Sequence, residues 1–283
     1  MIQKGPHTGL LGIILLLVIS VSIIHGKKAT IASPGTEKLH VTVDDALSLI
    51  DPLLISKSFD AAAHALSQLD QATIVSVIQT VIADESYLDK KEQALLMLFL
   101  IADLDNQSLH MQLYKLLKGN YVHEPIYAYG ILRNAGKGIE RVYKLAQKYD
   151  RSLAKTWAEK SFSYAIKINK VEILDQLYSL GIRVSPEFAS QLLHDVVMHQ
   201  KTVDFVPLLV RTMQADPNYS DDGLKTVLIP AVELKNEPMV RALLEQGADP
   251  KKMLDEEVGT ALQAAYENGD VVIEELLQEF QKK

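Results

Sequence analysis

Two histidines are the first residues in this chain whose type and spacing suggest chemistry. His194 and His199 stand five residues apart, with Asp195 between them. A metal site on one helix face needs ligands three or four residues apart, and the chain has no H-E-x-x-H motif. The histidines are therefore more typical of surface or hydrogen-bonded residues, and we predict no metal site and no cofactor.

Carboxylate pairs are the second chemical feature. Glu256-Glu257 and Glu274-Glu275 are adjacent in sequence, and adjacent residues on a helix point in different directions. A general acid and base must converge on one substrate, so these pairs indicate a solvated surface. Asp221-Asp222-Gly223 resembles a fragment of a calcium loop, but the remaining ligands are missing and a turn is expected.

Other catalytic signatures are missing from the sequence. It has no glycine-rich phosphate loop, no G-x-S-x-G motif and no dinucleotide fingerprint. It also has no cysteine, which excludes thiol catalysis, disulfides and Cys-ligated zinc and fits an extracytoplasmic location. The net charge of −7 argues against nucleic acid as a partner. We therefore expect a protein that is not an enzyme.

Three tyrosines leave two interpretations open. Tyr121, Tyr127 and Tyr129 lie close together in sequence. They could form an exposed aromatic contact patch, or they could pack between helices.

The elements that must position any site are predicted to be helices. A hydrophobic content of 48% with only 6% aromatic residues favours a core rich in Ala, Leu, Ile and Val. In residues 43–120, Thr42 or Asp44 can cap a first helix, and Pro52 is expected to begin a separate piece. Asp89 is expected to cap a buried helix over 93–102.

The C-terminal part repeats itself. The stretch from Thr260 to Ala265 echoes the stretch from Thr226 to Ala231, and 260 − 226 = 34. A self-similar period of this size predicts stacked helical hairpins.

The amino-acid sequence of these two units resembles the ankyrin repeat. The second unit matches at Thr260, Leu262, Ala265, Gly269, Ile273, Leu276 and Leu277. The first matches at Thr226, Leu228, Ala231, Val240, Leu243, Leu244, Gly247, Ala248 and Asp249, with Lys235 where glycine is usual. The resemblance implies an array that binds other proteins and is non-enzymatic.

The period continues upstream with weaker matches. Val196 aligns with Ala231, and Ala165 aligns with Val196, at offsets of 231 − 196 = 35 and 196 − 165 = 31. Ile139 to Leu145 is interpreted as the second helix of a degenerate unit. The resemblance thus covers about residues 125–283.

The N-terminus is predicted to carry a targeting signal. Leu10–Ile24 is an apolar run, too short for a typical transmembrane helix and at the upper limit for a signal-peptide core. Two alternatives stay open: cleavage near Ala32 with export, or retention as a single-pass membrane anchor. Residues 29–39 read as a linker.

These observations predict an all-α fold: an α-solenoid of stacked helical hairpins with an N-terminal helical cap region and an N-terminal hydrophobic helix. The predicted domains are 1–32 (signal or anchor), 33–42 (linker), 43–120 (helical cap) and 121–283 (ankyrin-like). The predicted function is a protein–protein interaction scaffold, with an unidentified protein partner, targeted to or across a membrane. Alternatives are an envelope assembly factor acting through the N-terminal helices, and an accessory domain of an enzyme.

The resemblance also implies where a partner binds, namely the turns that project between hairpins. These fingers are expected at 216–225 and 249–259. The residues that we predict to contact a partner are Asn218, Tyr219, Asp221, Asp222, Lys225, Lys251, Lys252, Met253 and Asp255.

Overall fold

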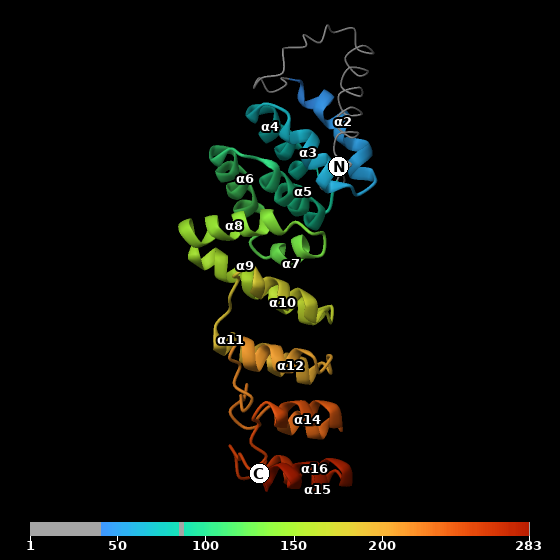
Figure 1. Ribbon diagram of the computed structural model, residues 1–283, viewed down its shortest axis with the longest axis vertical. Helices are drawn as coiled ribbons and strands as arrows, with labels where there is room; N and C mark the ends of the chain where they lie inside the picture. The colour runs from blue at the N-terminus through green and yellow to red at the C-terminus, as the bar shows by residue number, and fades with distance from the viewer. Residues whose placement is uncertain (1–40, 85–87, 283) are drawn as a thin grey trace, which may run out of the picture. The chain divides into compact units, whose positions relative to one another are not determined.

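The computed structural model describes residues 41–84 and 88–282, and within them every regular element is a helix (Figure 1). The predicted all-α class is confirmed. The predicted signal or anchor segment at 1–32, with its apolar core Leu10–Ile24, lies outside the described residues, as does most of the predicted linker. Among the residues that are described, no helix is long and apolar enough to cross a membrane.

The chain forms two compact units. Within the described residues, unit 1 comprises 41–122 and 132–150, and unit 2 comprises 123–131 and 151–282. Residues 132–150, which were predicted to belong to the C-terminal domain, pack in unit 1. The helices of unit 1 are α2 (Val43–Ile55), α3 (Phe59–Ser67), α4 (Gln71–Ala83), α5 (Lys90–Asp103), α6 (Gln107–Asn120) and α8 (Gly136–Tyr149).

Side-chain caps begin four helices of unit 1. Thr42, Asp70, Asp89 and Asn106 each accept a hydrogen bond from a backbone N–H in the first turn. Asp89 forms a reciprocal capping box with Glu92, which confirms the predicted cap of this helix. These caps fix where α2, α4, α5 and α6 start.

The predicted break at Pro52 is wrong. Pro52 lies inside α2, which runs without interruption to Ile55. A proline removes only one N–H donor, and here it stands near the end of a helix whose other side buries Ile50 and Leu54. The packing of α2 against α3 and α4 outweighs that local cost.

Helix α5 is the central element of unit 1. It packs against α3, α4, α6 and α8, and its residues from Gln93 to Leu98 are all buried. Gln93 is the polar exception in this core. Its Nε2 donates to the carbonyls of Val81 and Leu88, both at 2.9 Å, and its Oε1 accepts from the Tyr121 hydroxyl at 2.6 Å.

Unit 2 is built from successive helix pairs, most of them coloured from yellow to red in Figure 1. Its helices are α7 (Ile126–Ile131), α9 (Arg151–Lys167), α10 (Val171–Ser179), α11 (Pro186–Met198), α12 (Phe205–Pro207), the π-turn η1 (Leu208–Thr212), α13 (Leu228–Glu233), α14 (Glu237–Glu245), α15 (Ala261–Glu267) and α16 (Val271–Gln281). The helices α9, α11, α13 and α15 contact one another in that order. In the same way α12 contacts α14, and α14 contacts α16.

One turn geometry recurs four times between the paired helices. A residue with positive φ ends the first helix of each pair, at Asn169 (55°), Gln200 (47°), Lys235 (53°) and Gly269 (64°). The next residue donates its N–H to a carbonyl five positions back, which belongs in turn to Ala165, Val196, Ala231 and Ala265. These four are the residues that the sequence alignment made equivalent. Lys235 therefore occupies the turn position where the resemblance expected glycine.

The aromatic contact patch is not formed. Tyr121, Tyr127 and Tyr129 are all buried, so the packing alternative is the correct one. Tyr127 lies edge-on to Trp157 with ring centroids 6.0 Å apart. Tyr129 makes a similar contact with Tyr164, at 5.4 Å.

Candidate interaction surface

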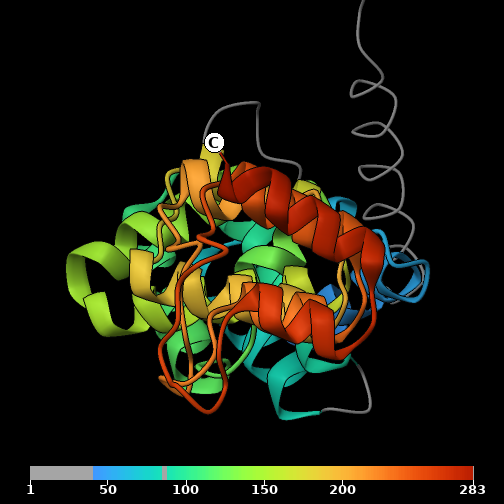
Figure 2. The same cartoon turned by 90° about the horizontal axis from the view of Figure 1, so that it is seen from below.

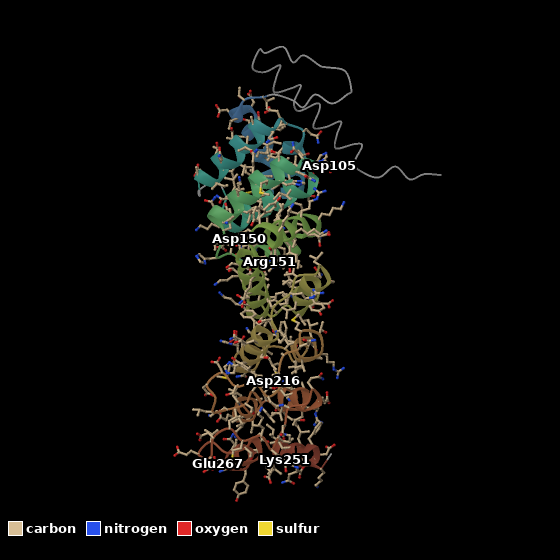
Figure 3. All side chains as sticks on the ribbon, turned by 90° about the vertical axis from the view of Figure 1, so that its left-hand side faces the viewer. Asp105, Asp150, Arg151, Asp216, Lys251 and Glu267 are labelled. Carbon is tan, nitrogen blue, oxygen red and sulfur yellow. The ribbon has the colours of Figure 1, made fainter. Side chains whose placement is uncertain are left out.

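The two predicted fingers begin with the same turn, one at Asp216 and the other at Asp249. Asp216 accepts a hydrogen bond from the N–H of Asn218 at 2.8 Å, and Asp249 accepts one from the N–H of Lys251 at 2.8 Å. Figure 3 labels Asp216 and Lys251 at these turns. An aspartate favours such a turn because its side chain replaces a backbone acceptor. Finger 1 (residues 216–225) and finger 2 (residues 249–259) thus leave their helices in equivalent ways.

Asn218 joins the two fingers. Its Oδ1 accepts from the N–H of Asp249 at 2.7 Å, and its Nδ2 donates to the carbonyl of Gly247 at 3.3 Å. The N–H of Asp216 donates to the hydroxyl of Ser190 on α11 at 2.8 Å. Asn218 was predicted to contact a partner, but its amide already holds one finger against the next.

The tip of finger 1 is closed by Asp222. Its Oδ1 accepts from the N–H groups of Leu224 at 2.8 Å and Lys225 at 3.1 Å, and Gly223 turns the chain with φ of 76°. These backbone hydrogen bonds hold the pKa of Asp222 below its usual value. The carboxylate is thus ionised and structural, and the motif Asp221-Asp222-Gly223 is a turn.

Asp255 closes finger 2 in the same manner. It accepts from the N–H groups of Glu257 at 2.8 Å and Val258 at 3.2 Å, and Gly259 follows with φ of 75°. The side chains of Glu256 and Glu257 are exposed. The shape of both fingers is therefore fixed by their own polar side chains.

Tyr219 lies between finger 1 and helix α11. Its ring meets the ring of His194 edge-on at 6.5 Å, and its hydroxyl donates to Asp221 at 3.2 Å. Partial burial is the main cause that raises the pKa of Tyr219, and the contact with Asp221 raises it further. The side chain is half-buried, so Tyr219 packs finger 1 against α11 at His194.

The predicted cations differ in their surroundings. Lys225 pairs with Glu233 of α13 at 2.5 Å, while Lys251 is exposed and Lys252 is half-buried. Met253 is 51% exposed. The most exposed apolar atoms of finger 2 thus lie within the set predicted to meet a partner.

Two apolar residues of the fingers were missed by the sequence reasoning. Leu224 and Leu254 are both exposed, next to Lys225 and Met253 respectively. The signal was present, because a large apolar residue within a polar turn has no helix face on which to be buried. With them, each finger carries exposed apolar atoms beside charged ones.

The other chemical candidates remain apart from one another. His199 contacts the carbonyl of Asp195 through Nδ1 at 2.9 Å, while His194 faces Tyr219. Within residues 41–84 and 88–282, no group of three or more His, Asp or Glu side chains could hold a metal ion.

Comparison of the whole chain with protein-family models gives no match, and neither does comparison with curated proteins. The resemblance to ankyrin repeats therefore rests on the residues quoted in the sequence analysis alone.

Proposed function

We propose that unit 2 is a solenoid of ankyrin-like hairpins and that its fingers bind another protein, without catalysis. One observation carries this proposal. Two fingers of equivalent geometry are joined through Asn218 and carry exposed apolar side chains on polar, internally hydrogen-bonded turns. A rigid support with exposed apolar anchors in a polar rim is the arrangement that interface hot spots require.

The solenoid interpretation is supported by the four equivalent turns and by the serial contacts of α9, α11, α13 and α15. In a solenoid each repeat contacts only its neighbours, and variable turns project from a constant frame. The frame explains why the fingers can differ in sequence without loss of the fold.

Within the predicted set, the residues divide by role. Asn218, Asp222 and Asp255 hold the turns, as their hydrogen bonds to backbone groups indicate. Met253 is the residue that we expect to contribute most to binding. The remaining contacts with the partner then come from Tyr219, Asp221, Lys225, Lys251 and Lys252, and Leu224 and Leu254 extend the apolar part.

The proposal is tested by site-specific photo-crosslinking in cells that naturally make the protein. A photoreactive residue replaces Met253 in finger 2 or Met198 at the end of α11. Met198 is a matched control because it is 47% exposed and lies outside the fingers. We expect a discrete adduct from position 253 and none from position 198. Equal labelling at both positions, or none at 253, would count against the finger surface.

Crosslinking from a third position distinguishes the finger surface from the main alternative, an assembly factor that acts through its N-terminal helices. Ile55 is exposed at the end of α2 in unit 1. An assembly factor that acts through its N-terminal helices would crosslink from position 55 and not from position 253.

We further propose that the chain is targeted to or across a membrane by residues 1–32. The supporting observation is the apolar run Leu10–Ile24 with lysines on both sides. The intact mass of the mature protein from its own cells tests it. A mass lacking the residues up to Ala32, or to a nearby position, indicates cleavage and export, whereas a full-length mass from the membrane fraction indicates a retained anchor.

A further inference from the structure

The last helix pair of unit 2 presents a face that the preceding pair does not. Helices α15 and α16 pack against α13 and α14 respectively, and Figure 2 shows α15 and α16 side by side in red. The turns at Lys235 and Gly269 are equivalent, so a residue in one pair corresponds to the residue 269 − 235 = 34 positions later. This offset allows the outer faces of the two pairs to be compared residue by residue.

Two positions on the first helix that are buried in the preceding pair are exposed in the last pair. Ile229 and Val232 of α13 are 1% and 0% exposed. Their equivalents on α15 are Gln263, which is exposed, and Tyr266, which is 74% exposed. The side chains at these two positions therefore lie on the face that a following helix pair covers.

On the second helix, the same face has become polar. Val240 and Leu244 of α14 are buried, and their equivalents on α16 are Glu274 and Gln278. Gln278 donates to Glu274 at 2.9 Å, one helical turn apart. A further hairpin of the same kind would bury the carboxylate of Glu274 at a position that is apolar in the preceding pair, which is costly, so this face does not suit another repeat of that kind.

Three exposed apolar residues flank the turn that joins these two helices. Tyr266, Val271 and Val272 are 74%, 62% and 58% exposed, and they lie on the two sides of the turn at Gly269. Val271 is one helical turn from Glu274 and Glu275 on α16. The equivalents of the two valines on the preceding pair are Glu237 and Pro238, so the last pair carries an apolar edge that the preceding pair lacks.

The charged side chains of α15 and α16 are all acidic. Residues 261–281 contain Glu267, Asp270, Glu274, Glu275 and Glu279, and no lysine, arginine or histidine. Lys282 follows at the C-terminal end of α16, and two cations of the preceding pair lie near the terminal pair. Lys235 donates to the carbonyl of Asn268 at 3.3 Å, whereas Arg241 pairs with Glu237 of its own helix at 2.8 Å. Neither cation forms an ion pair with Glu267, Glu274 or Glu275 among the described ion pairs, and Figure 3 labels Glu267 on the terminal pair.

We infer that this terminal surface, formed by Tyr266, Val271 and Val272 with Glu267, Glu274 and Glu275, binds a cationic, amphipathic segment of another protein. Large apolar side chains of the segment pack on the tyrosine and the valines. Lysines or arginines of the segment pair with the three glutamates, so the segment is positively charged where the surface is negatively charged. The surface is distinct from the fingers, and either assignment can fail without the other.

Charge also argues against other occupants. A second copy placed with the same surface against this one would bring two sets of carboxylates together, which is repulsive. An anionic lipid surface would be repelled in the same way. A cationic protein segment is the occupant whose chemistry satisfies both the apolar edge and the carboxylates.

The test uses the full-length chain and a short synthetic peptide of lysine and leucine at helical spacing, with binding followed by fluorescence anisotropy. A peptide with glutamate in place of lysine is the probe of opposite charge. We compare wild type with Glu267→Gln/Glu274→Gln/Glu275→Gln and with Tyr266→Ser/Val271→Ser/Val272→Ser. The matched control, Asp60→Asn/Asp105→Asn/Glu172→Gln, removes three exposed charges elsewhere. None of the six positions in the first two variants is buried, and circular dichroism verifies that each variant is folded.

We expect the lysine peptide to bind wild type and the glutamate peptide not to bind. Each terminal-surface variant should raise Kd by roughly tenfold, and the glutamine variant should also weaken the dependence on salt. The matched control and Met253→Ala/Leu254→Ala should leave Kd unchanged. No binding of the lysine peptide at millimolar concentration, or equal loss in the matched control, overturns the inference. Self-association of wild type that disappears in the serine variant would assign the surface to a second copy and overturn it as well.

Discussion

The crossing of α5 and α8 yields the sharpest prediction about unit 1. Gly138 of α8 lies so close to α5 that an added Cβ would stand 2.0 Å from the carbonyl oxygen of Leu98 and 2.7 Å from its carbonyl carbon. Ordinary contacts of a Cβ begin at 3.4 Å, so both distances are far too short and Gly138→Ala requires the two helices to move apart. The obstacle is backbone, which cannot move aside by rotating a side chain.

The cost can be worked out from two opposing effects. Overpacking a core costs about 1–3 kcal/mol, and a clash with backbone belongs at the upper end, about 3 kcal/mol. Alanine favours a helix over glycine by about 1 kcal/mol. The net loss is about 2 kcal/mol, which corresponds to a roughly 30-fold change in the unfolding equilibrium.

Urea unfolding followed by circular dichroism measures this loss, and hydrogen exchange of the α5 amides localises it. The chain supplies a matched control, because Gly136 begins the same helix and has nothing within 4 Å of an added Cβ. Gly136→Ala should be neutral or stabilising by up to about 1 kcal/mol. If Gly138→Ala is as stable as wild type, or if both variants lose the same stability, the proposed close approach of α5 and α8 is refuted.

Three further predictions concern polar groups and turns. Gln93→Leu should cost about 2–3 kcal/mol in urea unfolding, because three buried hydrogen bonds lose a partner, while Tyr121→Phe should cost only about 1 kcal/mol. Lys235→Gly should stabilise the folded protein by about 1 kcal/mol, because glycine adopts the positive φ of this position without strain. Gly269→Ala should destabilise it by about 1 kcal/mol, because an added Cβ meets no atom there and only the positive φ is strained. Asp222 has a folded pKa below its unfolded value, so its stabilisation is present above the unfolded pKa and is lost as pH falls through the folded one. Thermal unfolding of Asp222→Asn between about pH 2 and pH 5 should therefore show a smaller dependence on pH than wild type.

Much of the C-terminal unit could be predicted because its periodicity is local. Ala165, Val196, Ala231 and Ala265 were aligned by sequence spacing, and their carbonyls accept equivalent hydrogen bonds in the four turns. The amino acid at the turn itself was less informative. Asn, Gln, Lys and Gly all adopt positive φ there, since hairpin packing on both sides fixes the conformation and outweighs its cost.

Unit 1 was less predictable because its packing is not periodic. Its caps at Thr42 and Asp89 follow from local hydrogen bonding and could be predicted. The continuity of α2 through Pro52 and the placement of α8 against α5 depend on contacts distant in sequence. Gly138 carries no sequence sign that its missing Cβ admits the carbonyl of Leu98, which belongs to a helix far earlier in the chain.

The candidate surfaces show the same division between local and non-local causes. The aspartates of the fingers could be identified as turn residues, since their hydrogen bonds reach only two or three positions along the chain. The exposure of Tyr266 could not be predicted, because a residue at its position is buried in the preceding pair, where Val232 is covered by the next hairpin. Whether an apolar side chain belongs to the core or to an interface thus depends on what stacks above it. For this reason α15 and α16 match the preceding pair at the core positions and differ from it at the positions that the next hairpin covers, as Val232 and Tyr266 show.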